Sequence, residues 1–330
     1  VWTEAGKHQT NIRLQGPLQL FDRFIEEDNF LGGAASGSSD WQVLVALRGM
    51  PERGKNADIG VTVTSDLVGT AIDLPAPFGK SPGSTRQLTI VQERLGVEEG
   101  VVRLNYSDLV EGLLLMTPGE EGFALQKGAI TVGGKKPVLP DSKQLLLSGH
   151  LERFRLSDWQ PYLGGRGRAS DAGGGEADLP LAVDVAVDEL EALGYELGVV
   201  SLTLGSSGSR REIRVDGPSV VGDIELTNTA AGLDSVTMTL ERLALESASG
   251  EQQQSDTGSD FTPSDFPDLQ IITKQLLYDG VDLGLFEVKA YKQADDLYFI
   301  ERVVFASDLL SARISGNWRL QRGEQLSSVD

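Results

Sequence analysis

The chain has 330 residues, and its 29 Lys and Arg against 49 Asp and Glu give a formal net charge of −20. A charge of this sign argues against a nucleic-acid partner, because phosphate binding needs a cationic face. It also argues against attachment to an anionic membrane surface by charge alone. Cysteine is absent, which excludes disulfides, thiolate metal sites and a cysteine nucleophile.

No apolar run approaches the roughly 20 residues that a membrane-spanning helix needs. The sequence starts at Val1 without the basic and apolar segments of a signal peptide. We therefore expect a soluble segment of a longer protein, with any membrane anchor upstream of it.

In chain order, the first expected element is a short helix near 18–27, where Leu20, Phe21, Phe24 and Ile25 supply an apolar side. After it, apolar and polar residues alternate with period two, as in Ile59-Gly-Val-Thr-Val-Thr64. Such strands bury one face and leave the other in water, as antiparallel meanders do. A second short helix is expected over 157–163, with Ser157 as its cap.

Two stretches lack the aliphatic residues of a core and predict linkers. The first is Gly-rich and covers 164–178, and the second is polar and covers 247–264. They divide the chain into a β-sheet region at 1–163, which includes both short helices, and two β units at 179–246 and 265–330.

The two later units are similar to each other. Gly194 and Gly280 are 86 residues apart, and so are Gly198 and Gly284, with matching apolar residues between them. A glycine at a turn supplies a positive φ angle. The repetition predicts an all-β, extended, curved and mostly antiparallel sheet, which grows by addition of hairpin units into a rolled groove.

Alternation also predicts which residues line the apolar face of the later strands. The opposite, wet face is expected to carry Asp184, Asp188, Glu287 and Lys289. The groove candidates are Val183, Val185, Val187, Val200, Leu202, Leu204, Phe286 and Val288.

No motif predicts catalysis, so we do not expect an enzyme. Gly79-Lys80-Ser81 has the end of a phosphate-binding loop, but Pro75 and Pro77 remove backbone N–H groups that would hold phosphate, which favours a simple turn. Only two histidines are available as a general base. The carboxylates between Asp171 and Glu191 lack the spacing of a calcium loop and indicate a solvated face. No catalytic residue, metal or cofactor is expected.

Several motifs resemble those of YhdP-type proteins, which belong to the AsmA-like group and are related to the TamB transporters. The most specific begins with a strand and continues as Asp73-Leu-Pro-Ala-Pro-Phe-Gly-Lys80. A Gly-x-x-x-Trp strand start is similar to Gly37-Ser-Ser-Asp-Trp41, and a Leu-Asp-x-Trp corner to Ser148 through Trp159. The later copies, closing with Ser315-Gly-Asn-Trp318, resemble the C-terminal units of the family.

The resemblance implies a segment of a bridge-like phospholipid transport protein in the periplasm of a Gram-negative bacterium. The parent protein would be anchored in the inner membrane and would support the lipid balance and permeability barrier of the outer membrane. Its partners would be phospholipid acyl chains, with envelope proteins as further partners. The alternative is a structural or interaction module of the envelope, in which the same sheet closes on its own core.

Overall fold

The structure of the chain is a computed structural model. It describes residues 2–4, 7–18, 34–48, 58–95, 99–119, 122–163, 179–192, 194–207, 210–229, 232–246, 266–294, 296–308, 310–321 and 324–329. Leu18 ends a strand, and the rest of the helix predicted near 18–27 lies outside these residues. The linkers predicted at 164–178 and 247–264 lie outside them as well.

The described chain is all-β, as the alternation predicts. Contacts divide it into two compact units, the first made of Val1–His150 with Asp158–Val183 and the second of Leu151–Ser157 with Asp184–Asp330. The strands up to β11 are β1 (Trp2–Glu4), β2 (Lys7–Leu18), β3 (Ala35–Gly37), β4 (Ser39–Arg48), β5 (Asp58–Ser65), β6 (Thr70–Ile72), β7 (Leu88–Leu95), β8 (Gly100–Tyr106), β9 (Val110–Gly119), β10 (Gly122–Val132) and β11 (Leu145–Arg155).

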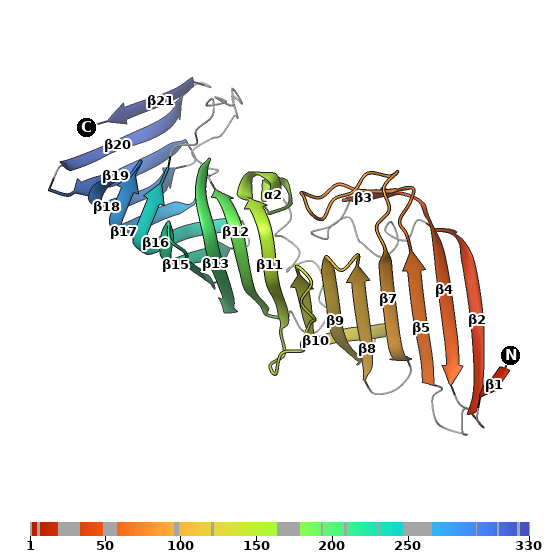
Figure 1. The fold of residues 1–330 in the computed structure, drawn as a ribbon. Helices are drawn as coiled ribbons and strands as arrows, with labels where there is room; N and C mark the ends of the chain where they lie inside the picture. The colour runs from red at the N-terminus through yellow and green to blue at the C-terminus, as the bar shows by residue number, and fades with distance from the viewer. Residues whose placement is uncertain are drawn as a thin grey trace. The chain divides into compact units, whose positions relative to one another are not determined.

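The first unit is a sheet in which neighbours in sequence are mostly neighbours in space (Figure 1). Its pairing order runs β1, β2, β4, β5, β7, β8, β9 and β10, antiparallel throughout, and β10 then pairs with β11 in parallel. Strands β3 and β6 form a separate small ladder. They lie with the loops at one end of the long strands.

A short helix, α2 (Leu156–Leu163), follows β11 where the Ser-Asp-Trp pattern predicts it. Pro161 inside it cannot donate a backbone hydrogen bond, which disfavours a long helix here, and α2 ends at Leu163. The remaining strands are β12 (Leu181–Ala192), β13 (Tyr195–Ser207), β14 (Arg210–Asp216), β15 (Val220–Thr229), β16 (Gly232–Leu245), β17 (Asp268–Tyr278), β18 (Val281–Ala294), β19 (Leu297–Ala306), β20 (Ser311–Gln321) and β21 (Glu324–Val329).

The second unit pairs in the same manner. Strands β13 to β16 are antiparallel, β16 and β17 are parallel, and β17 to β21 are antiparallel again. Strand β13 also approaches β16, two strands beyond its paired neighbour β14, so this part of the sheet curls. Gly194 and Gly280 have φ angles of 81° and 77°, and Gly198 and Gly284 have 66° and 70°. The glycines of the two copies thus share their backbone conformation.

Candidate functional site

The apolar face of the second unit contains one row of side chains that crosses the strands without a polar break. Paired residues on neighbouring strands point to the same face of a sheet, so the register defines such a row. All members are half-buried. This unit-2 row consists of Leu204, Ile213, Ile224, Met238, Ile271, Val288, Val303 and Ile314.

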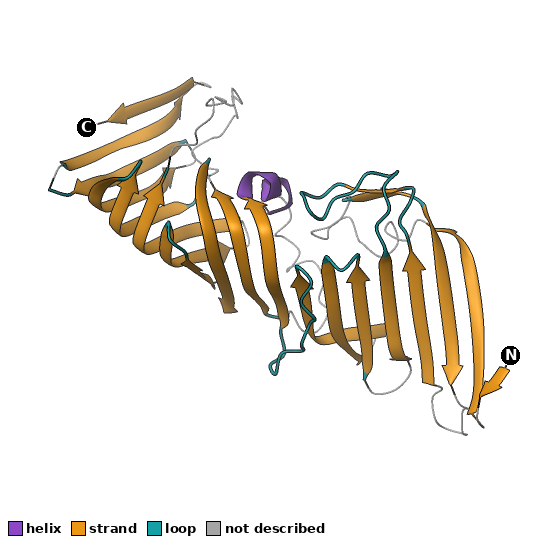
Figure 2. Cartoon of the chain, in the orientation of Figure 1, coloured by secondary structure: helices purple, strands orange, loops and turns teal. Residues whose placement is uncertain are grey.

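The first unit contains an equivalent row. Its strands lie side by side in Figure 2, and the register carries the row from β2 to β11. Leu14 at its start is 57% exposed, and Gly112 is its single buried member. This unit-1 row consists of Leu14, Val43, Val63, Ile90, Leu104, Gly112, Ile130 and Leu147.

The face opposite the unit-2 row carries charged pairs. Arg214 and Asp223, which oppose each other on β14 and β15, lie 3.1 Å apart. Arg302 binds Glu287 across β18 and β19. The two faces of this sheet therefore differ in chemistry, with aliphatic side chains on one and ion pairs on the other.

Four of the eight predicted groove residues lie in rows of residues that are paired from strand to strand. Leu204 and Val288 both belong to the unit-2 row. Leu202 and Phe286 belong to the adjacent row, through Val215, Gly222, Leu240 and Thr273. All four are half-buried, which leaves part of each side chain accessible to a ligand.

The other predicted groove residues lie on β12 and β13. Val183 is half-buried on β12, whereas Val185, Val187 and Val200 are only 6%, 1% and 0% exposed. Side chains with so little exposure are packed against protein. Asp184 and Asp188, expected on the wet face, are exposed. Contact between any of the eight candidates and lipid stays a prediction.

Sequence reasoning did not foresee how one edge of the first unit is buried. Next to the unit-1 row, Trp41, Leu88 and Tyr106 join Leu67 in a core cluster. Burial raises the pKa of the Tyr106 hydroxyl, and Arg86 opposes this shift. Burial lowers the pKa of Lys80, whose charge Asp66 helps to retain. The Leu-Pro-Ala-Pro-Phe-x-Lys motif was the available signal, but it did not indicate what the lysine binds.

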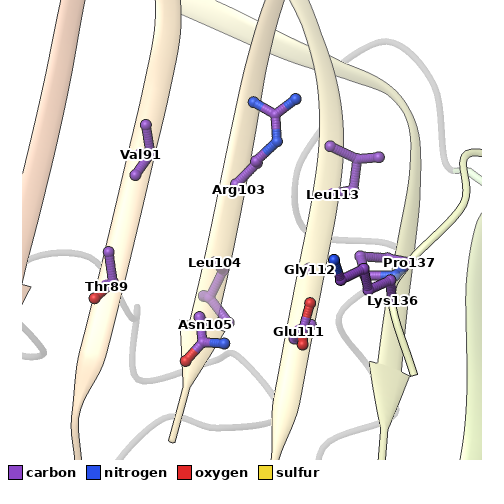
Figure 3. A pocket seen from close by; sticks show the side chains of 10 residues that line it. All are labelled: Thr89, Val91, Arg103, Leu104, Asn105, Glu111, Gly112, Leu113, Lys136 and Pro137. Carbon is purple, nitrogen blue, oxygen red and sulfur yellow. The ribbon is translucent and has the colours of Figure 1, made fainter. Parts of the chain in front are cut away.

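A hollow of about 340 Å³ lies in the first unit (Figure 3). Most of the residues that line it, such as Arg103 and Glu111, are sequence neighbours of unit-1 row members and so belong to the opposite face of the sheet. Lys136, from the loop after β10, also lines it. The Arg103 guanidinium is already paired with Glu93 at 2.9 Å, and both side chains are well exposed. The Arg103 side chain is therefore not held ready for an anion in the hollow.

Within the described ranges, no group of three or more metal-ligating side chains could hold a metal ion. In the same part of the chain, no helix has the length and apolar character needed to cross a membrane.

The fold and the two rows define a class of β protein in which a sheet presents a continuous aliphatic face. The family model described as YhdP protein matches residues 2–330, so the chain belongs to the YhdP family. Searches of curated proteins and of solved structures found no match. Family membership points to a role in the cell envelope.

Proposed function

We propose that this chain is a non-enzymatic, periplasmic segment of a bridge-like phospholipid transport protein of a Gram-negative bacterium. The parent protein is anchored in the inner membrane and supports outer-membrane lipid balance and the permeability barrier. Membership in an envelope family supports this proposal. The observation that carries it is the unit-2 row, which crosses from β13 to β20 with half-buried aliphatic side chains and no polar member.

The chemistry of the row suits an acyl chain. Removing apolar surface from water contributes about 0.8 kcal/mol for each buried CH₂ group. Half-buried side chains contact only one side of the ligand, so each position contributes a part of this amount. The sum over many positions retains a lipid, while equal neighbouring contacts let it move along the row. The polar head group stays in solvent, where no desolvation penalty arises.

The proposal can be tested with neighbouring residues on opposite faces of β13. A photo-crosslinking amino acid at Leu204 should capture phospholipid in cells, because Leu204 belongs to the unit-2 row. The same group at Thr203, which is exposed on the opposite face, should not. Lipid analysis of the adducts provides the measurement. Equal capture at both positions, or none at Leu204, would argue against lipid transport along this row.

A structural module is the second candidate function. The near-complete burial of Val187 and Val200, which pack against protein, favours it. Leu202→Asp separates the two candidates. In an open face the aspartate stays hydrated, so the fold survives and lipid capture falls. In a closed core it would bury an unpaired charge and unfold the unit. Unfolding without lipid capture in the parent chain would support the module.

A further inference from the structure

At one end of the strands of the first unit, the side chains of the apolar face are buried. The residues next to the unit-1 row form an edge row, and neighbouring rows lie about 7 Å apart along the strands. Trp41 and Leu88 in the edge row are 2% and 7% exposed, whereas Val43 and Ile90, two residues further along the same strands, are half-buried. The edge row consists of Trp41, Ser65, Leu88, Tyr106, Val110 and Val132.

The segment 66–87, between β5 and β7, covers this edge row. Leu67 has no exposed surface and packs in the cluster with Trp41, Leu88 and Tyr106. Ile72 on β6 packs against the same cluster. The start of the segment is fixed by Ser65, whose hydroxyl oxygen accepts a bond from the Leu67 N–H at 3.0 Å.

A buried lysine holds the segment in its folded shape. Lys80 is 8% exposed, and its ammonium donates to the carbonyl oxygens of Leu67 at 2.8 Å, Ser81 at 2.9 Å and Thr70. An ammonium has three donors, so all of them are satisfied within the segment. Backbone bonds of 2.9 Å in both directions join Lys80 to Ile72. The charge therefore acts inside the protein and is not presented to a head group.

A second set of contacts braces the segment from outside. The Tyr106 hydroxyl, from the edge row, donates to the Phe78 carbonyl at 3.0 Å. The Phe78 ring meets Trp159 of α2 edge to face, with 5.7 Å between centroids. Tyr162 of the same helix donates its hydroxyl hydrogen to the carbonyl of Asp73. These contacts tie the segment to the edge row and to α2.

We propose that segment 66–87, locked by Lys80, is a fixed side wall that keeps acyl chains on the unit-1 row and excludes them from the edge row. This inference rests on the proposed function, because a wall needs a lipid to confine. It makes Lys80 a positioning residue for lipid, which acts through the segment and does not touch the ligand. Lipid then moves across the strands along the rows, with one lateral limit set by the wall.

The absence of cysteine allows a direct test with single-thiol variants. The probe is a vesicle of phospholipids that includes a lipid with a thiol-reactive group at its acyl-chain end. Ile90→Cys should react with this lipid, and Leu88→Cys, two residues away on the same face of β7, should react about tenfold more slowly. Adding Lys80→Met should raise the rate at Leu88→Cys toward that at Ile90→Cys. Lys143→Met, at an exposed loop lysine, should not.

Where Lys80→Met fails to fold, Tyr106→Phe removes a single hydroxyl tie and should give a smaller increase at Leu88→Cys. Equal rates at the two thiols in the parent chain would overturn the wall while leaving the proposed function intact. A Leu88→Cys rate unchanged by both Tyr106→Phe and a folded Lys80→Met would also overturn it. No reaction at Ile90→Cys would overturn the wall, because no lipid would then lie on the unit-1 row, whereas lipid capture at Leu204 on the unit-2 row tests the proposed function separately.

Discussion

Among individual residues, Tyr298 on β19 shows how an aromatic side chain is buried in the second unit. It is 7% exposed, and its hydroxyl donates to the Pro267 carbonyl at 2.7 Å. The Phe266 ring contacts both the Tyr298 ring and the Trp318 ring, at centroid distances of 5.9 Å and 5.3 Å. Burial, with a smaller effect of Asp268, raises the pKa of Tyr298 from 10.0 to about 12.

This shift predicts a loss of stability in alkali. Because the pKa in the folded chain lies above that in the unfolded chain, the contribution of Tyr298 is complete below pH 10 and is lost as the pH rises toward about 12. Tyr298→Phe should lower the free energy of unfolding by about 1 kcal/mol at neutral pH. It should also make the decrease in stability at alkaline pH less steep. Urea midpoints measured across this range provide the check, with exposed Tyr278→Phe as the control. If the stability of Tyr298→Phe decreases just as steeply with pH as that of the parent chain, Tyr298 is not the cause of the alkaline loss.

The repeated glycines give a matched pair of substitutions. Gly198 and Gly284 both have positive φ angles, which cost alanine about 1–2 kcal/mol. A Cβ at Gly198 would meet open space, whereas one at Gly284 would lie 2.2 Å from the Ala306 carbonyl oxygen. Gly284→Ala should therefore lower the urea midpoint clearly more than Gly198→Ala. Equal losses would mean that the two copies do not differ as the structure indicates.

The same residues show how far local sequence can be used for prediction. The equivalence of the glycines was predictable, because turn conformation depends on a residue and its neighbours. The position of the Lys80 ammonium was not. Its acceptors at Leu67 and Thr70 lie 13 and 10 residues earlier, and they meet it only when the segment folds back. Gly79-Lys80-Ser81 predicted a turn, and the sequence contained no local sign of the buried contacts.

Among strands, alternation predicted the all-β class, and the register places Leu202, Leu204, Phe286 and Val288 on one face, because side-chain direction has period two in any strand. The partner of each strand depends on the tertiary fold, so the parallel pairs β10–β11 and β16–β17 were not predictable. The register shifts at Val221/Gly222 and Thr273/Leu276 were not predictable from the sequence for the same reason. Leu202 and Phe286 are linked across these strands by a register that alternation cannot supply.

The parallel β16–β17 pair separates the effect of burial from that of charge. Leu276 is 6% exposed and opposes Leu243 and Gly284, so Leu276→Ala should cost about 2–5 kcal/mol. Lys274 and Glu241 lie 2.6 Å apart but are 66% and 59% exposed, so Lys274→Ala should cost less than about 1 kcal/mol. Urea unfolding of both variants measures the difference. A larger loss of stability for Lys274→Ala than for Leu276→Ala would show that exposed ion pairs stabilise the β16–β17 pair more than burial does.

At the scale of the whole molecule, the net charge of −20 and the aliphatic rows act together. Negative charge repels anionic head groups and other copies of the chain. The proposed attraction to phospholipid would then come from acyl chains against the rows, because their contribution does not depend on charge. Binding of the proposed kind would be distributed over many positions and would not need a specific polar site.

The most direct measurement is native mass spectrometry of the chain purified from the envelope of Gram-negative cells. The parent chain should carry phospholipid. Met238→Asp should carry clearly less, because Met238 lies in the unit-2 row, and Thr239→Asp should carry as much as the parent, because Thr239 is exposed on the opposite face. Circular dichroism should show that both variants keep their sheet. A lipid-free parent chain, or equal lipid content in the two folded variants, would contradict lipid binding along the rows.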